Sequence, residues 1–472
     1  MLPRLARPRV TTLLAAAAVG VYVLVVVGAT AAFADAASAC STWPACSGSP
    51  PGSDLGVAVA LAHRAVALAV GVGIIAAAVA VVRSDTSRRV TAATVAALVL
   101  YPAQIAVGAL VATSGAAAPF PGIHLLVGVS IFGALVLALA WHLEVVTGGA
   151  DDPLEAPAPI EPDPTAESEI DDATATPLAD RPLSERVTAR GFAYFRLMKP
   201  RLMWLLCLVA AAAMALAGGP SLEVRTIVLT LGGGVLAIGA SGTFNHVLER
   251  ERDKRMSRTN DRPVATHQIP EFRAVVFGLG LTALSLAVFL VVNALTAALG
   301  LAAILFYTVV YTLVLKPNTV QNTVIGGAAG ALPALIGWAA VTGRIGVPGV
   351  ALAGLIFVWT PAHFYNLALA YKEDYARGGF PMMPVVRGET TTRKHILLWL
   401  GATLAAALAL IGVTDLGWLA AAATTLLGAV FLLAVVRLHR EQTEQAAFRA
   451  FHASNAYLGV VLLAVVVDAL VI

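Results

Sequence analysis

Residues 226–263 read TIVLTLGGGVLAIGASGTFNHV followed by LERERDKRMSRTNDRP, and this stretch decides the class of fold. Residues 226–247 carry no charge and are long enough to cross a bilayer as one helix, which needs about 20 mostly apolar residues. A densely charged segment follows at once. We therefore expect a membrane-spanning helix that ends at the water interface and presents charged side chains there.

Uncharged runs of this kind recur along the whole chain. The 472 residues are 58% hydrophobic and only 12% charged, whereas soluble domains carry about 25% charged residues. We predict an all-α polytopic membrane protein, with the lipid bilayer and no nucleic acid among its partners. About thirteen spans are expected, four before residue 150 and nine after residue 200: 11–33, 55–82, 91–112, 123–143, 202–219, 226–247, 272–292, 294–314, 323–341, 348–369, 395–413, 415–436 and 453–471.

The orientation of the spans follows from the short loops between them. Arginines precede the first span and lie between the second and third, whereas the loops at 34–54 and 113–122 carry no Lys or Arg. Because Lys and Arg concentrate in cytoplasmic loops, we expect a cytoplasmic N-terminus, an outside C-terminus and a location in the cell membrane. The same rule places the basic loops at 250–273, 371–394 and 437–449 in the cytoplasm. A cleaved signal peptide is the alternative for the first span, although its apolar run exceeds the 7–15 residues of a signal core.

A change of composition divides the chain into three predicted parts. Residues 151–185 contain eleven Asp and Glu and a single Arg, with repeated Pro, Ala and Thr. Such a segment cannot bury enough apolar surface to fold. We therefore predict a four-helix membrane module over 1–147, a disordered cytoplasmic linker over 148–189 and a nine-helix membrane domain over 190–472.

The charged end of the opening stretch carries a candidate metal and diphosphate site. Asn245, Glu249 and Asp253 are spaced by four residues, so a continuous helix would place them on one face. Mg²⁺ is held by one or two protein carboxylates together with substrate phosphate oxygens. Basic residues that could neutralise a diphosphate follow at the same spacing: Lys254, Arg258 and Arg262. The alternative is a positive-inside loop whose acids only pair with its arginines.

A second polar cluster follows the span that ends near residue 369. Tyr371, Lys372 and Asp374 belong to this cluster, which is expected on the same cytoplasmic side. Lys316, after another span, faces that side too, either as a diphosphate ligand or as a simple positive-inside anchor. Two such clusters on one membrane face suggest two half-sites around one diphosphate, each with its own metal ligand.

Four separated motifs resemble those of the UbiA-type intramembrane prenyltransferases, and among them most closely the protohaem IX farnesyltransferases, or haem O synthases. The segment Asn245–Pro263 is similar to their first acidic motif. The similarity covers about residues 190–472, and nine helices are typical of the family. The other motifs are 194–201, then 311–316 with 322–327, Pro333 and 337–338, and finally 359–364 with 373–375 and 380–386.

The resemblance implies a transferase that joins the farnesyl group of farnesyl diphosphate to haem B and, with water, yields haem O. It implies Mg²⁺ held by Glu249 and Asp253, with a second site near Asp374, and diphosphate contacts that include Lys199 and Lys372. His363, inside the third motif, becomes a candidate haem contact. Two rival functions remain open: another UbiA-type prenyltransferase with a quinone precursor or lipid as acceptor, and a non-enzymatic haem carrier.

The first four spans carry a smaller polar set. His63 and His124 lie at similar depth on neighbouring spans, where two neutral imidazoles could ligate one haem iron. Cys40 and Cys46 lie in an outside loop, where a disulfide can form, although two free thiols are the alternative. These residues resemble one four-helix half of haem A synthase over about 10–145, and that family usually has two halves. The resemblance implies a bound haem in this module, and haem A synthase or a second copy of this chain as a partner.

Overall fold

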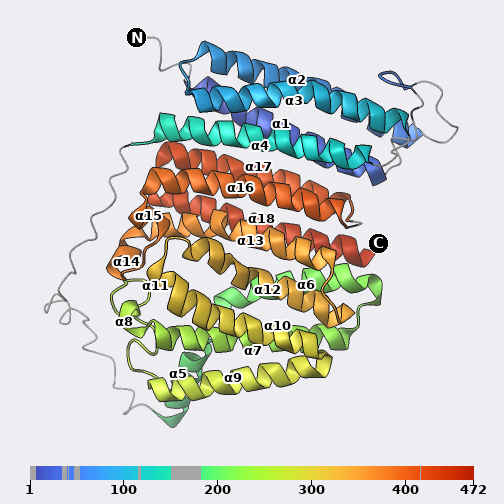
Figure 1. Ribbon diagram of the computed structural model, residues 1–472. Helices are drawn as coiled ribbons and strands as arrows, with labels where there is room; N and C mark the ends of the chain where they lie inside the picture. Colours follow the sequence, from blue (N-terminus) through green and yellow to red (C-terminus); the bar gives the residue numbers. More distant parts are fainter. Residues whose placement is uncertain are drawn as a thin grey trace. The chain divides into compact units, whose positions relative to one another are not determined.

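The computed structural model describes residues 7–33, 40, 42–46, 54–114, 119–149, 182–414 and 416–471. All regular structure in this part is helical, and thirteen of the described helical spans are long and apolar enough to cross a membrane (Figure 1). The predicted all-α membrane fold is therefore confirmed. The helices are α1 Arg7–Phe33, α2 Asp54–Arg83, α3 Arg88–Thr113, α4 Phe120–Thr147, α5 Leu183–Leu197, α6 Pro200–Gly218, η2 Gly219–Ser221, α7 Val224–Leu248, α8 Arg250–Asp253, α9 Glu271–Val292, α10 Ala294–Leu305, η3 Phe306–Leu315, α11 Lys316–Asn318, α12 Asn322–Thr342, α13 Val347–Ala370, α14 Lys372–Arg377, α15 Met383–Val386, α16 Glu389–Gly412, α17 Trp418–Glu441 and α18 Glu444–Val471.

The chain packs as two compact units. One unit holds α1 to α4 together with the chain from Arg393 onward, and the other holds α5 to α15 and ends at Thr392. The boundary at Thr392 falls inside α16, and so inside the segment 190–472 that the sequence predicts as one domain. The predicted linker over 148–189 lies mostly outside the described residues. Its last residues begin α5, because α5 starts at Leu183.

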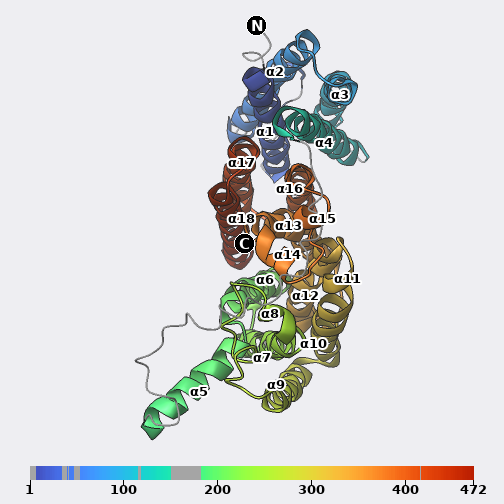
Figure 2. The same cartoon turned by 90° about the vertical axis from the view of Figure 1, so that its left-hand side faces the viewer.

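In the first unit, helices from both ends of the sequence share a core. α1 packs on α2 and α4, α3 packs on α4, and α17 packs on α18 (Figures 1 and 2). The helix α17 also contacts α1 and α4. Buried aromatic rings fill the core, with Tyr22 5.4 Å from Phe132 and Phe431 6.2 Å from Tyr457 between ring centroids.

In the second unit, small residues let the spans approach closely. α7 packs on α9, and α12 packs on both α6 and α13. A Cβ atom on Gly337 of α12 would lie 2.3 Å from the carbonyl oxygen of Ala210 in α6, so a larger residue cannot occupy that position. Small residues serve the same purpose in membrane helices generally, because the hydrophobic effect does not drive helices together in lipid.

The span Ala294–Asn318 is not a regular α-helix. Its middle, Phe306–Leu315, is π-helical, and π-helical turns are frequent at functional sites. The hydroxyl of Thr312 donates to the carbonyl oxygen of Tyr307 five residues earlier, at 2.8 Å. The wider turn changes which side chains share one face of the span. Lys316 follows directly after the π-helical segment.

Candidate active site

The predicted carboxylates lie where α7 ends. α7 stops at Leu248 and α8 begins at Arg250, but the backbone bonds continue across the junction. The amide of Glu249 donates to the carbonyl of Asn245 at 2.9 Å, and the amide of Asp253 donates to that of Glu249 at 2.8 Å. The three residues therefore keep the spacing of one continuous helix. All three are buried, with Asp253 fully so.

Two basic side chains contact these buried carboxylates. Lys316 Nζ lies 2.6 Å from Oε1 of Glu249. Arg262 Nη1 lies 2.7 Å from Oδ2 of Asp253 and 3.9 Å from Oε2 of Glu249. One guanidinium nitrogen thus faces both acids at once, so a single positive charge at that point interacts with both carboxylates.

Lys199 extends the cluster from the segment that joins α5 to α6. Its ammonium group donates to the side-chain oxygen of Asn245 and lies 3.4 Å from the hydroxyl of Tyr307. The close approach needs Gly242 of α7, since a Cβ atom there would lie 2.9 Å from the carbonyl oxygen of Leu197. Lys199 itself adopts a left-handed backbone conformation, with φ of 55°.

Burial and charge set different ionisation tendencies for the two acids. Burial raises the pKa of Glu249, but the charges of Lys316 and Lys199 and the Lys316 hydrogen bond outweigh burial and leave this pKa below its usual value. Burial also raises the pKa of Asp253, and there Arg262 does not fully offset it. The pKa of Lys199 is lowered by its own burial and then by the nearby charge of Arg262. Asp253 is therefore the acid that a further cation would stabilise most.

Asp374 of α14 connects the second predicted cluster to the first. Its Oδ1 accepts hydrogen bonds from the Ser257 hydroxyl at 2.8 Å, from the Ser257 amide at 3.2 Å and from Arg377. Its Oδ2 accepts from the amide of Arg258 at 3.0 Å. Burial opposes ionisation, but the bonds from Arg377 and Ser257 outweigh it and lower the pKa of Asp374. This carboxylate therefore fastens the loop after α8 to α14.

Aromatic rings contact Arg258 of the same loop and Lys316 of α11. The Arg258 guanidinium lies 4.8 Å from the ring centroid of Tyr371 and 5.3 Å from that of Tyr375, and it donates to the Tyr375 hydroxyl at 3.2 Å. Lys316 Nζ lies 4.3 Å from the ring centroid of Phe380. Such cation–π contacts orient a cation while they leave its other donors available.

Other predicted residues lie apart from this cluster. Lys254 is exposed and pairs with Glu251 at 3.3 Å, and Lys372 pairs with Glu389 at 3.1 Å. The chain turns after Asp253, so the four-residue repeat of the basic residues does not continue as one helical face. His363 stacks on the Trp359 ring at a centroid distance of 4.3 Å in α13.

Some residues of the site were not predicted from the sequence. Thr312 accepts a hydrogen bond from the Asn245 amide group at 3.2 Å, and Ser257, Arg377 and Phe380 contact charged members of the site. The spacing of Arg377 three residues after Asp374 could have indicated its role. The π-helical turn that positions Thr312 leaves no comparable signal in the sequence.

An apolar cavity adjoins the cluster. Lys199 and Tyr307 line it, and these two residues also contact each other at the site. The rest of the wall comes mainly from apolar residues of α6, α7, α10 and α12, including Leu206, Ala237 and Ile336. Lys199 of the charged cluster therefore forms part of the wall of this apolar cavity.

The chemistry of the acids fits a magnesium ion. Among the described residues, no group of three or more His, Cys, Asp or Glu side chains is placed to hold a metal, so Asp374 does not join the other two acids. Mg²⁺ in proteins commonly takes one or two carboxylates and completes its shell with substrate phosphate or water. The Arg262 nitrogen marks a position where a cation faces both Glu249 and Asp253, and these two acids are the donor set that fits.

The N-terminal residues gather at one end of α2 and α4. The Nδ1 atoms of His63 and His124 are buried without a hydrogen-bond partner among the described residues. Nε2 of His124 lies 3.3 Å from the Gln104 amide nitrogen. Glycines face both rings, because a Cβ atom on Gly28 would lie 3.2 Å from His63 and one on Gly108 would lie 2.9 Å from His124.

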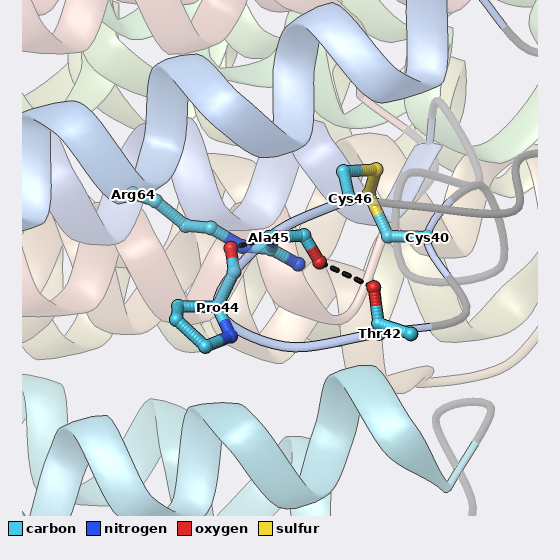
Figure 3. The surroundings of a disulfide bond; sticks show 6 residues. All are labelled: Cys40, Thr42, Pro44, Ala45, Cys46 and Arg64. Atoms are coloured by element: carbon cyan, nitrogen blue, oxygen red, sulfur yellow. Dashed lines mark hydrogen bonds between the residues drawn. A yellow bond between two sulfur atoms is a disulfide. The ribbon is translucent and has the colours of Figure 1, made fainter.

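Cys40 and Cys46 form a disulfide (Figure 3). In the loop between them, the Thr42 hydroxyl donates to the carbonyl of Ala45 at 2.6 Å. Arg64 of α2, next to His63, donates to the carbonyl of Pro44 at 2.5 Å, as Figure 3 shows. The disulfide loop is thereby attached to the helix that carries His63.

Comparison with known proteins identifies the family. The model of the UbiA prenyltransferase family matches residues 205–459. The chain belongs to the UbiA prenyltransferase family. The match begins beyond α4, so the first four helices lie outside the part that defines this family.

Several known proteins are similar in sequence to this chain. A protoheme IX farnesyltransferase of Haloarcula marismortui is 64% identical over 98% of each chain, and one of Halobacterium salinarum is 57% identical over 97% of each. A protoheme IX farnesyltransferase of Saccharopolyspora erythraea is 43% identical over 59% of this chain and 90% of its own. The solved structure of digeranylgeranylglyceryl phosphate synthase is 15% identical, with a TM-score of 0.51 over 60% of this chain and all of that one, and it supports the fold.

Proposed function

We propose that this protein is a protohaem IX farnesyltransferase, which joins farnesyl diphosphate and haem B and, with water, releases haem O and diphosphate. The observation that carries the proposal is the identity of 57% to 64%, over nearly the whole chain, to proteins named for that reaction. The structure supports it with a cluster of basic residues and two buried carboxylates beside an apolar cavity.

The basic residues would bind the diphosphate of the donor. Lys316 and Arg262 lie within 2.6 to 2.8 Å of the carboxylates, so they are in reach of phosphate oxygens bound beside those acids. Glu249 and Asp253 would hold Mg²⁺, which when bound stabilises the negative charge that develops on the leaving diphosphate. A second metal at Asp374 would compete with the hydrogen bond from Arg377. Lys199 and Arg258 would supply further positive charge to the same group.

The apolar cavity would hold the isoprenoid tail and exclude water. During transfer the allylic C–O bond of the donor breaks, and its electron pair leaves with the diphosphate. The π electrons of a haem vinyl group then form the new C–C bond, and the resulting cation takes up water and loses a proton. Tyr307 and Tyr311, whose rings lie 5.5 Å apart, would stabilise positive charge through their faces. His363, packed flat against Trp359, stays a candidate contact for the haem.

The first four helices would bind a haem of their own. His63 and His124 each keep a buried Nδ1 atom without a hydrogen-bond partner among the described residues, and this supports axial ligation by imidazole. We propose a half-size haem A synthase-like module, which works with haem A synthase or with a second copy of this chain. We also propose that the enzyme lies in the cell membrane with its prenyltransferase site toward the cytoplasm.

The decisive experiment uses membranes from a host that lacks haem O. The chain is expressed unchanged or with Glu249→Ala plus Asp253→Ala, and the extracted haems are separated and weighed. A haem heavier by a hydroxyfarnesyl group, lost in the double variant, supports the assignment. Unchanged haem B in the presence of donor refutes it. Prenylation of a quinone precursor or lipid would then indicate the related transferase. Haem binding that survives the double variant, without diphosphate release, would indicate a carrier.

A further inference from the structure

The four helices α1 to α4 are buried very unequally. In the most apolar stretch of each helix, 56% of α1 and 44% of α4 is buried, compared with 28% of α2 and 17% of α3. The helix α17 contacts both α1 and α4, and it is this pair of helices that is the more buried. The asymmetry marks a face formed by α1 and α4, which we call the α1–α4 face.

A close backbone approach joins the α1–α4 face to α16. A Cβ atom added to Gly401 of α16 would lie 2.7 Å from Cγ1 of Val136 in α4. The α4 residues beside it, Leu135 and Leu139, are fully buried. Glycine at such a position lets two membrane helices pack backbone against side chain without a gap.

Aromatic residues continue the same core toward α17 and α18. Tyr22 of α1 packs on Phe132 of α4, and Phe431 of α17 packs on Tyr457 of α18. The helix α17 contacts α1, so the two aromatic pairs belong to helices that pack together. All four rings are buried. One continuous core therefore includes the first and the last helices of the chain.

Polar contacts fix the C-terminal end of α4. The Lys394 ammonium group of α16 pairs with the carboxylate of Glu144. The side-chain amide of Gln442, just after α17, donates to the carbonyl of Thr147 at 2.6 Å. These directional contacts set the register of α4 against α16 and α17, which apolar packing alone specifies weakly.

We infer that α1 to α4 form a built-in partner subunit, which docks through the α1–α4 face on a surface made by α16, α17 and α18. The docking surface lies largely within the part that matches the UbiA family, residues 205–459, and the docked helices lie outside it. The packed face, rather than the connecting segment 148–189, holds the two parts together. The kind of partner this surface fits is a four-helix membrane module. The inference goes beyond the proposed function and does not depend on it.

The test cuts the connection and asks whether the parts stay together. A specific protease site is inserted between residues 160 and 161 of the full chain, which carries a C-terminal affinity tag. The purified protein is cleaved in mild detergent and passed again over the affinity resin. We expect the untagged N-terminal fragment to remain bound with the tagged one. Release of that fragment from the unsubstituted protein would overturn the inference.

A matched pair of glycines tests the face itself. Gly401→Leu forces a side chain into Val136 and should reduce retention of the fragment about tenfold, the effect of a modest overpacking penalty. Gly133→Leu on α4 is the control, because a Cβ atom there meets nothing within 4 Å. Equal retention in the two variants would contradict the docking surface.

A charge exchange covers the case in which Gly401→Leu fails to fold. Glu144→Lys places two ammonium groups side by side and should lower retention, and the added change Lys394→Glu should restore it. Failure of the second change to restore retention would count against the pair as a docking contact. Because the readout is physical association, loss of the haem O assignment would leave these results unaffected, and the reverse also holds.

Discussion

Arg262 Nη1 lies 2.7 Å from Oδ2 of Asp253 and 3.9 Å from Oε2 of Glu249, so one guanidinium links two buried acids. Each acid comes from the junction of α7 and α8, while Arg262 returns from the loop that follows. The charge of Arg262 therefore holds the loop after α8 against the two acids. Loss of Arg262 leaves Asp253 buried without its ion-pair partner, whereas Glu249 keeps Lys316 at 2.6 Å.

Arg262→Ala should be severely destabilising. Asp253 is fully buried, and removal of one partner from a buried ion pair costs about 3 to 5 kcal/mol. Thermal unfolding of the purified protein in detergent would show a lowered midpoint, and diphosphate release would fall with it. Arg255→Ala serves as the control because Arg255 is exposed on the same loop. Similar unfolding midpoints in both variants would contradict the bridging role.

Lys316→Met should weaken the binding of the prenyl donor. Lys316 lies 2.6 Å from Glu249, within reach of a phosphate bound beside that acid, and a hydrogen bond from its ammonium group to the diphosphate would contribute about 1.5 to 3 kcal/mol. We expect KM for farnesyl diphosphate to rise by roughly tenfold to a hundredfold. Lys254→Met is the matched control, since Lys254 is exposed and pairs with Glu251. If Lys316 is only a positive-inside anchor, membrane insertion will change and KM will not.

The sequence predicts the acids of this site but not how the loop after α8 folds back onto them. The apolar run over 226–247 and the spacing of Asn245, Glu249 and Asp253 are local features, and backbone bonds across the α7–α8 junction preserve that spacing. The contacts of Arg262 and Asp374 depend on how the loop after α8 turns back, which helical periodicity does not encode. The fold, like the site, can be predicted from the sequence only in part. Span positions come from hydropathy, whereas the packing of α17 on α1 and α4 comes from side-chain shape.

Asp374→Asn should loosen the loop that carries Arg258. The carboxylate accepts bonds from the Ser257 hydroxyl and amide, from Arg377 and from the Arg258 amide. An asparagine keeps one acceptor oxygen and loses the charge that attracts Arg377. Limited trypsin digestion should then cleave the loop between residues 254 and 262 several-fold faster. Asp261→Asn is the control, because its carboxylate is largely exposed and pairs with Arg196. Unchanged cleavage would mean that other contacts hold the loop.

Gly234→Phe should shorten the cavity proposed for the isoprenoid tail. Gly234 lines that cavity, and a Cβ atom on it meets nothing within 4 Å, so a larger side chain can extend there. We expect turnover with farnesyl diphosphate to fall at least about tenfold relative to turnover with the shorter geranyl diphosphate, since each excluded methylene group costs about 0.8 kcal/mol. Gly232→Phe tests specificity, as Gly232 also has open space but does not line this cavity. A uniform fall with both donors would place the tail elsewhere.

His63→Ala and His124→Ala should each remove one axial ligand from a haem in the first four helices. Both rings keep a buried Nδ1 atom without a hydrogen-bond partner among the described residues, and a glycine faces each of them. With one imidazole lost, the iron should change its spin state, and with both lost the purified protein should retain several-fold less haem. Absorbance spectra and the haem content per chain report these changes. His452→Ala provides the control, because His452 is exposed on α18. If the double variant retains as much haem as this control, the haem lies outside the His63 and His124 site.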